Sequence, residues 1–177
     1  MNMISKGKYF VLFAIVSITA VFLITGCNKS KTNKKLFAAV EVFNVPKRAA
    51  GQSHVLELRT APLDTVRIAI IGLGMRGQDA VYRLSYIEGV KIVALADVVP
   101  ANVEKAQNTL KELNKPEAVS YTETEDWKKI CERNDIDLVY VCTHWDSHTP
   151  IAIYAMEHGK HAAIEVPAAL TIDEAWQ

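Results

Sequence analysis

The segment that most restricts the fold of this chain is a short apolar strand pattern followed at once by three spaced glycines. Residues 66–71 (VRIAII) are β-branched and almost entirely apolar, as expected of a strand buried on both faces of a parallel sheet. Residues 72–77 (GLGMRG) follow without a gap and have the spacing Gly-x-Gly-x-x-Gly. A strand that turns through such a loop into a helix is typical of α/β proteins that bind dinucleotides.

Strand and helix patterns alternate over the rest of the chain. Apolar stretches predict strands at residues 90–96, 118–121, 136–142 and 161–165. Helical periodicity lies between them, at residues 78–87, 100–113, 126–133 and 149–158, and residues 173–177 begin one more helix. The alternation predicts an α/β fold, a doubly wound parallel sheet of the Rossmann type with right-handed crossovers. We assign residues 66–177 to this domain and expect it to be incomplete at its carboxyl end.

Each glycine of the loop has its own task in binding a dinucleotide. Gly72 permits the tight turn, Gly74 lets a pyrophosphate approach the backbone, and Gly77 lets the helix pack closely on the strand. The helix amino terminus then offers N–H groups and a partial positive charge to the phosphates. Met75 and Arg76 lie inside the loop and are also predicted cofactor contacts, although Arg76 is alternatively an ordinary surface arginine.

An acidic residue, Asp97, ends the second predicted strand. A carboxylate at this place accepts hydrogen bonds from the hydroxyl groups of the adenosine ribose, and it repels the additional phosphate of NADP. The glycine loop and the acid together therefore predict NAD as the cofactor. The alternative is that the glycine loop is only a tight structural turn.

The segment 142–150 (CTHWDSHTP) lies just beyond the carboxyl end of a predicted strand, where open α/β sheets bind their ligands. Its side chains are suited to flank the nicotinamide or its ribose. The predicted cofactor contacts here are Trp145, Asp146, Ser147 and His148. The segment also fits a helix-capping loop with Pro150 at the first helical position. A zinc site from His144, Asp146 and His148 would have no familiar ligand spacing, so we predict no metal.

A third segment, 161–167 (HAAIEVP), ends the next predicted strand at the same edge of the sheet. Together with the glycine loop and residues 148–150 and 159–161, it resembles the nucleotide-binding half of the Gfo/Idh/MocA family. The resemblance adds Glu165 and Val166 to the predicted cofactor contacts. The family commonly has Glu-Lys-Pro here, and its lysine assists proton transfer at a sugar hydroxyl. Val166 stands in that place and neither donates nor accepts a proton, which disfavours an ordinary sugar dehydrogenase.

Residues 71–77, 132–141 and 155–167 resemble one branch in particular, glycoside hydrolase family 109, whose known activity is that of an α-N-acetylgalactosaminidase. The resemblance implies a redox route in which the sugar C3 hydroxyl is oxidised by NAD, the aglycone leaves by elimination, water adds, and the hydride returns. In that branch the base and most sugar contacts belong to a second, α+β domain. We expect that domain to be missing here, so no catalytic residue is assigned within the 177 residues.

The amino-terminal residues have the pattern of a bacterial lipoprotein signal peptide. Lys6 and Lys8 precede a mostly apolar run over residues 9–24, and residues 23–27 (LITGC) resemble a lipobox. The run has about 16 residues, whereas a membrane span needs roughly 20. We therefore predict cleavage before Cys27, acylation of its thiol, and attachment to the bacterial cell envelope, with the periplasmic side favoured over the cell surface. The alternative is a plain membrane anchor with an incidental cysteine.

Charge is balanced over the whole chain, with 20 Lys and Arg against 20 Asp and Glu, and gives no reason to expect a nucleic-acid partner. Residues 1–26 are the predicted signal peptide, and residues 27–65 a basic tether followed by an amino-terminal arm. The expected partners are NAD, a glycan or amino-sugar substrate bound through the missing domain, and a membrane. Two other functions stay open: a Gfo/Idh/MocA sugar oxidoreductase, and a lipid-tethered nucleotide-binding fragment without catalysis.

Overall fold

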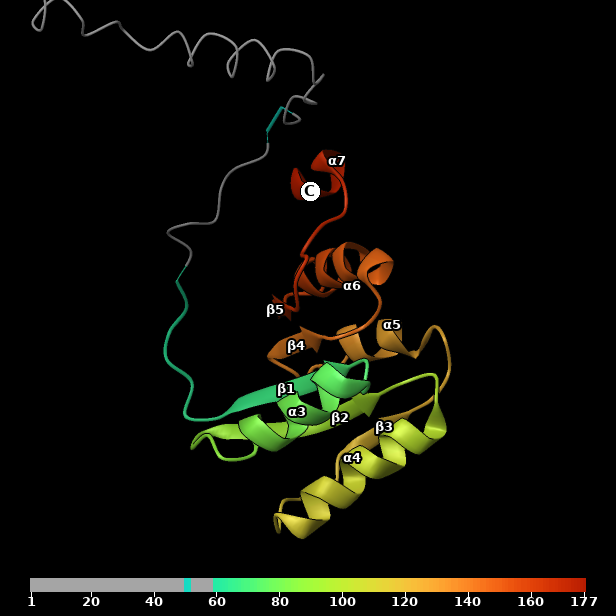
Figure 1. The fold of residues 1–177 in the computed structure, drawn as a ribbon. Helices are drawn as coiled ribbons and strands as arrows, with labels where there is room; N and C mark the ends of the chain where they lie inside the picture. Colours follow the sequence, from blue (N-terminus) through green and yellow to red (C-terminus); the bar gives the residue numbers. More distant parts are fainter. Residues whose placement is uncertain (1–49, 52–58) are drawn as a thin grey trace, which may run out of the picture. The chain divides into compact units, whose positions relative to one another are not determined.

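The computed structural model describes residues 50–51 and 59–177, and the longer range contains a sheet of five parallel strands (Figure 1). The strands are β1 (Val66–Ile71), β2 (Val90–Ala96), β3 (Val119–Tyr121), β4 (Leu138–Val141) and β5 (His161–Ile164). From edge to edge their order is β3-β2-β1-β4-β5. Because β1 pairs with β2 on one side and with β4 on the other, the winding of the chain reverses beside β1. Open α/β sheets bind ligands at such a reversal.

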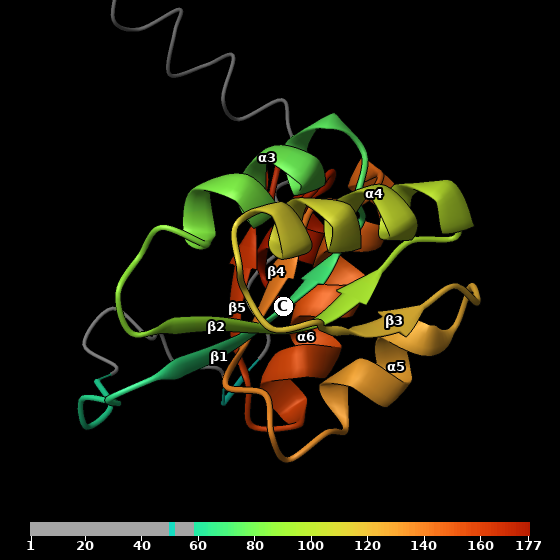
Figure 2. The ribbon, with the colours of Figure 1, turned by 90° about the horizontal axis from the view of Figure 1, so that it is seen from below.

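Helices cover both faces of the sheet, as Figure 2 shows. The described helices are α3 (Met75–Leu84), α4 (Pro100–Glu112), α5 (Asp126–Cys131), α6 (Trp145–Glu157) and α7 (Ile172–Ala175). Helices α3 and α4 lie on one face, and α5 and α6 lie on the other. A capping box between Thr171 and Glu174 begins α7. Parallel strands joined by helices, two on each face of the sheet, confirm the predicted doubly wound α/β fold.

Both faces of the central strand β1 are buried, which explains its unbroken apolar sequence. Ile68 and Ile70 belong to the core beneath α3 and α4, while Ala69 and Ile71 belong to the core beneath α5 and α6. The first core also contains Val81, Leu95, Val103 and Leu110, and the second contains Ile130, Val139, Val141 and Ile151. Alternation of side chains along the strand therefore supplies two separate cores from one continuous apolar run.

A bidentate ion pair joins the starts of β1 and β4. Arg67 donates from Nε to Oδ2 of Asp137 at 2.9 Å and from Nη2 to Oδ1 at 2.6 Å. The backbone N–H of Arg67 also donates to Oδ2, at 2.8 Å. Hydrogen bonding from Arg67 lowers the pKa of Asp137 to about 2, although burial acts in the opposite direction. The contact holds two central strands together at the end of the sheet that is opposite their carboxyl ends.

Two helices begin earlier than the sequence pattern predicts. Helix α3 starts at Met75, so the second half of the glycine loop is already its first turn. Helix α6 starts at Trp145, and Pro150 lies inside it. The prediction that Pro150 occupies the first helical position is therefore wrong. The N–H that Pro150 lacks would have bonded to the carbonyl of Asp146, which lies in the exposed first turn where water can satisfy that carbonyl.

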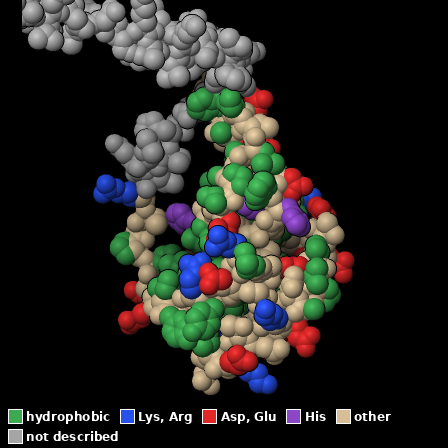
Figure 3. Space-filling model, viewed as in Figure 1, with side chains coloured by type: hydrophobic (Ala, Val, Ile, Leu, Met, Phe, Trp, Pro, Cys, Tyr) green, Lys and Arg blue, Asp and Glu red, His purple; other side chains and the backbone are tan. Residues whose placement is uncertain are grey.

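Acidic and basic side chains are interspersed over the face of the described residues that Figure 3 shows. The predicted signal peptide, Cys27 and most of the predicted tether lie outside the described residues. Within the described part of the chain, no helix has the length and apolar character needed to cross a membrane.

Candidate functional site

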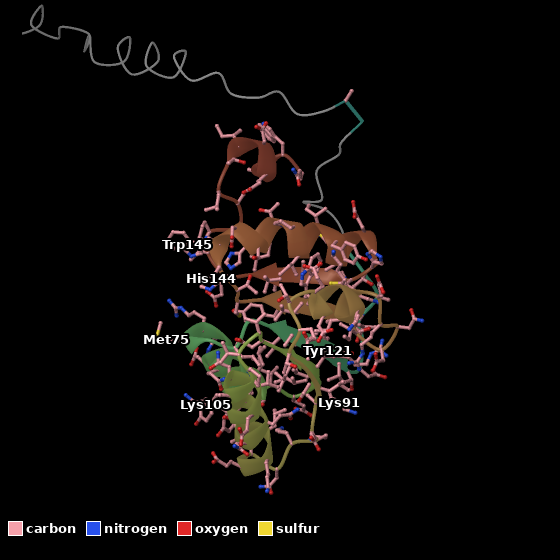
Figure 4. All side chains as sticks on the ribbon, turned by 90° about the vertical axis from the view of Figure 1, so that its right-hand side faces the viewer. Met75, Lys91, Lys105, Tyr121, His144 and Trp145 are labelled. Atoms are coloured by element: carbon pink, nitrogen blue, oxygen red, sulfur yellow. The ribbon has the colours of Figure 1, made fainter. Side chains whose placement is uncertain are left out.

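A cavity of about 530 Å³ opens where the carboxyl ends of β1, β2 and β4 meet. Its walls also include the turn before α5 and the first residues of α6. In Figure 4 the side chains of Met75, at the start of α3, and of His144 and Trp145, at the start of α6, lie along this same side of the molecule. The volume is in the range of sites that hold a cofactor or a small molecule. The cavity therefore lies where the strand order predicts a ligand.

The glycine loop has a geometry that larger residues do not fit. Gly72 has a φ of +89°, and a Cβ there would lie 2.6 Å from the carbonyl carbon of Cys142. A Cβ on Gly77 would lie only 1.9 Å from the carbonyl oxygen of Gly72. Gly74 differs, because a Cβ there would meet no atom within 4 Å and would project into open space beside the cavity. That open space is what a phosphate needs in order to reach the backbone.

The amino terminus of α3 offers hydrogen-bond donors beside this space. Gly74 is the residue that precedes the helix, and no side chain caps it. The first helical bond runs from the N–H of Gln78 to the carbonyl of Gly74 at 2.9 Å. The N–H groups of Met75, Arg76 and Gly77 therefore have no acceptor inside the helix. Together with the helix dipole they form a site suited to an anion such as a pyrophosphate.

Asp97 joins the glycine loop to the start of α4. Its Oδ2 accepts a hydrogen bond from the N–H of Leu73 at 2.6 Å, and its Oδ1 accepts one from the N–H of Val99 at 2.8 Å. The half-buried carboxylate also lines the cavity. Each carboxylate oxygen has more than one lone pair, so both bonds leave acceptor capacity for ribose hydroxyl groups. Asp97 thus fits the adenosine ribose and is at the same time part of the scaffold.

Further carboxylates lie on the cavity wall near Asp97. Glu123 and Glu125 come from the turn before α5, and Asp146 comes from the first turn of α6. Negative charge on several sides of one cavity disfavours an additional phosphate on the ribose. The residues present fit NAD: a glycine cradle for the pyrophosphate, a carboxylate for the ribose, and acidic walls that disfavour NADP.

The four predicted cofactor contacts in the segment 142–150 differ in their exposure and in whether they line the cavity. Asp146 and Ser147 line the cavity, whereas Trp145 does not and is 62% exposed. His148 is only 1% exposed. All four belong to the first turns of α6 rather than to a loop. Their contact with a cofactor stays a prediction, and the burial of His148 gives that side chain a structural task in addition.

His148 and Thr149 bind the segment that follows β5. Nδ1 of His148 lies 2.8 Å from the carbonyl oxygen of Pro167, and Nε2 lies 3.1 Å from the carbonyl oxygen of Thr143. The hydroxyl of Thr149 donates to the carbonyl of Ala168 at 2.8 Å. The start of α6 therefore positions residues 165–168, which contain two predicted cofactor contacts.

Glu165 and Val166 differ in their surroundings. Glu165 is half-buried, and its Oε1 accepts a hydrogen bond from the hydroxyl of Tyr140 at 2.6 Å. Val166 is 81% exposed. Burial, and then the bond to Glu165, raise the pKa of Tyr140 to about 12, and burial likewise raises the pKa of the Cys142 thiol to about 12. Both groups are therefore neutral at physiological pH.

Two residues near the site are absent from the sequence predictions. Tyr140 brings a hydroxyl into an otherwise apolar strand, and that interruption is a signal that points to a buried partner. Gln78 donates from Nε2 to the carbonyls of Leu73, at 2.9 Å, and of Asn102, at 2.7 Å, and so ties the glycine loop to α4. Nothing local in the sequence distinguishes Gln78 from a surface residue. Among the residues that the structure describes, no group of three His, Cys, Asp or Glu side chains is placed to hold a metal ion.

Proteins with a known family name are similar in sequence to most of this chain. The "Glycosyl hydrolase family 109 protein 1" of Phocaeicola vulgatus is 54% identical over 161 residues, which cover 89% of this chain and 34% of that protein. The "Alpha-N-acetylgalactosaminidase" of Bacteroides fragilis is 52% identical over 130 residues, which cover 73% of this chain and 31% of that protein. The chain therefore spans about a third of the length of the curated relatives it matches.

A solved structure of similar fold is scyllo-inositol dehydrogenase from Lactobacillus casei, with bound cofactor NAD(H) and scyllo-inositol. It is 30% identical with a TM-score of 0.53, and the match covers 62% of this chain and 30% of that one. The family model that describes an oxidoreductase family with an NAD-binding Rossmann fold, Gfo/Idh/MocA, matches residues 66–177. This match includes the glycine loop, Asp97 and the segment around Glu165, and NAD is accordingly the cofactor. The chain belongs to the Gfo/Idh/MocA oxidoreductase family.

Proposed function

We propose that this chain is the NAD-binding part of an exported glycosidase that hydrolyses terminal α-N-acetylgalactosamine. The observation that carries the proposal is the 52% identity to a protein named alpha-N-acetylgalactosaminidase, over 130 residues that cover 73% of this chain. Val166 supports it, because the lysine that serves proton transfer in sugar dehydrogenases of the family is replaced by a side chain without a titratable group. The remaining two thirds of such an enzyme would supply the sugar contacts and the base.

When bound, NAD supplies a reversible hydride acceptor for C3 of the sugar, so the cofactor is restored in each turnover. The residues of this chain bind and orient it. The glycine loop and the start of α3 would hold the pyrophosphate, and Asp97 would hold the adenosine ribose. Three apolar side chains of the described residues are largely exposed, with exposed fractions of 83% for Met75, 62% for Trp145 and 81% for Val166. A substrate domain that covers them would exclude water from the reacting carbon atoms.

The location of the protein is a separate part of the proposal. Export and attachment through a lipid on Cys27 agree with the basic start, apolar run and LITGC sequence of the amino terminus. A second lipid chain makes such an anchor stable, since each buried methylene contributes about 0.8 kcal/mol. An enzyme that restores its own NAD suits a compartment with no supply of fresh cofactor.

The test of the activity uses p-nitrophenyl α-N-acetylgalactosaminide with NAD. It is given to the 177-residue chain and, separately, to an extended version that also contains the proposed substrate domain. We expect turnover by the extended protein alone, without net accumulation of NADH. Gly74→Ala in the extended protein is expected to reduce that turnover at limiting NAD, because the methyl group occupies the phosphate position while the protein stays folded.

Steady production of NADH from a free sugar would instead support a sugar oxidoreductase. Turnover by the 177-residue chain itself would show that catalytic residues lie in this half of the enzyme. No turnover and no NADH from the extended protein, combined with normal NAD binding, would support a nucleotide-binding module without catalysis.

A further inference from the structure

The Tyr140 hydroxyl orients the carboxylate at the end of β5. Tyr140 pairs with Ala163 across the β4–β5 ladder, and Glu165 follows two residues later on the same face. The hydroxyl donates to Oε1 of Glu165 at 2.6 Å, a short distance that is typical of a bond to a carboxylate. With a pKa of about 12, Tyr140 keeps its proton at neutral pH and acts as a donor. The bond therefore restricts Glu165 to a rotamer that lies over β4.

A basic residue on α3, Arg83, is paired with an acidic residue of the same helix. Arg83 interacts electrostatically with Tyr140, and it donates from Nε to Oδ2 of Asp79 at 2.6 Å. The charge of Arg83 is thus offset by Asp79. Among residues 59–177, no Lys, Arg or His forms an ion pair with Glu165. The carboxylate of Glu165 therefore contributes a negative charge at the carboxyl end of β5.

The strand order indicates which end of the cofactor lies nearest this charge. Asp97, at the end of β2, is placed for the adenosine ribose, and the glycine loop after β1 is placed for the pyrophosphate. A dinucleotide that crosses the sheet in this direction has its nicotinamide beyond β4, towards β5. Cys142, which lines the cavity, is the neighbour of Glu165 on the adjacent strand, because the N–H of Glu165 donates to the carbonyl of Val141.

We propose that Glu165, held in place by Tyr140, makes the site bind the oxidised cofactor more tightly than the reduced one. The nicotinamide ring is cationic in NAD and neutral in NADH, so a nearby carboxylate attracts only the oxidised form. Preference for the oxidised form lowers the reduction potential of the bound pair and makes the return of hydride to the sugar more favourable. This inference requires that the chain binds NAD. The proposed function enters only as the reason why such a preference is useful, so failure of the inference would leave the glycosidase proposal standing.

The experiment compares affinities for NAD and for NADH, measured by calorimetry on the full chain. Glu165→Gln removes the charge and keeps the shape, while Tyr140→Phe removes only the hydroxyl that orients the carboxylate. The chain offers a matched control, because Tyr154 donates to Glu132 at 2.7 Å on the outer side of α6. The control variants are Tyr154→Phe and Glu132→Gln. The ratio of the two dissociation constants is measured on one preparation, so a partly unfolded variant lowers the binding stoichiometry without changing the ratio.

Glu165→Gln is expected to reduce the preference for NAD over NADH by about tenfold, which corresponds to about 30 mV in the two-electron potential of the bound pair. Tyr140→Phe should change the ratio in the same direction by about threefold, or ~0.7 kcal/mol. Both control variants should keep the wild-type ratio. An unchanged ratio in Glu165→Gln would overturn the proposal. A shift in Glu165→Gln with none in Tyr140→Phe would overturn the orienting role of Tyr140.

Discussion

Nδ1 of His148 lies 2.8 Å from the carbonyl oxygen of Pro167, and this contact joins the start of α6 to the segment that leaves β5. The same imidazole lies 3.1 Å from the carbonyl oxygen of Thr143 through its other nitrogen. His148 is 1% exposed, so both contacts are shielded from solvent. One buried ring thus connects the two loops that follow β4 and β5.

Removal of this ring is expected to loosen residues 165–168. His148→Ala leaves a cavity and removes the hydrogen-bond donor of a buried carbonyl oxygen, and it should cost about 2–4 kcal/mol of unfolding free energy. Urea unfolding measures the loss, and hydrogen exchange of the amides around Glu165 measures the loosening. His161→Ala, at an exposed position on β5, is the control and should change neither by much. Equal exchange in the two variants would contradict the positioning role of His148.

The glycine loop offers a pair of substitutions with opposite effects. Gly77→Ala places a Cβ 1.9 Å from the carbonyl oxygen of Gly72, so the loop must move, and we expect a loss of about 3 kcal/mol or more in stability. Gly74→Ala meets no neighbouring atom and should change stability by less than about 1 kcal/mol. It should nevertheless weaken NAD at least about tenfold, because the methyl group occupies the path of the pyrophosphate. Thermal unfolding and calorimetry separate the two effects, and full NAD affinity in Gly74→Ala would place the pyrophosphate elsewhere.

Loss of the Asp97 carboxylate should change both cofactor choice and stability. Asp97→Ala removes the acceptor for the ribose, and NAD should bind about ten- to a hundredfold more weakly, while discrimination against NADP decreases. The variant also leaves the N–H groups of Leu73 and Val99 without their acceptor, so its melting temperature should fall. Asp173→Ala, in exposed α7, serves as the control for loss of one acidic residue. Equal affinity of the wild-type chain for NADP and NAD would refute this role of Asp97.

The ion pair between Arg67 and Asp137 should make stability depend on pH in the acidic range. The pKa of Asp137 is about 2 in the folded chain, below its ordinary value of 3.8, so the folded state binds the proton less readily than the unfolded state. The contribution is therefore fully present above pH 4 and is lost as the pH falls towards 2. Asp137→Asn should be less stable than the wild type at pH 7, and the difference should shrink by pH 3. A difference that stays constant between these two pH values would disprove the assignment.

Acylation of Cys27 is tested by labelling the exported protein with palmitate. The wild-type chain should carry the label and fractionate with membranes, whereas Cys27→Ala should lose both properties. Cys131→Ala is the matched control, because Cys131 is buried on α5 and should have no part in attachment. Label that persists on Cys27→Ala would exclude this anchor.

Local sequence patterns predict those parts of the site whose residues lie close together in the chain. The spacing of Gly72, Gly74 and Gly77 encodes the turn, the approach of the phosphate and the close packing of α3 in one short stretch. The apolar run of β1 encodes burial on both faces. The alternation of strands and helices predicts a parallel doubly wound sheet with right-handed crossovers, whereas the order of the strands comes from the structure.

The contacts that support these patterns join residues far apart in the chain. The bonds of Leu73 to Asp97, of Tyr140 to Glu165 and of His148 to Pro167 span 24, 25 and 19 residues. No local periodicity encodes such pairs, since each depends on the distance between two strand ends in the folded sheet. The early start of α6 has a similar origin. Contacts of His148 and Thr149 with the segment after β5 stabilise a turn that precedes Pro150, whereas the preference of proline for the first helical position predicts a later start.

The central place of β1 also determines when the cofactor site is complete during synthesis. Arg67 and Asp137 are 70 residues apart in sequence, yet they lie on neighbouring strands at the middle of the sheet. One edge of β1 therefore stays unpaired until the ribosome has released β4, long after the glycine loop has emerged. The cavity also needs Thr143 and Ser147, which follow β4. Binding of NAD to a nascent chain would consequently report the docking of β4 beside β1, and not the earlier formation of the glycine turn.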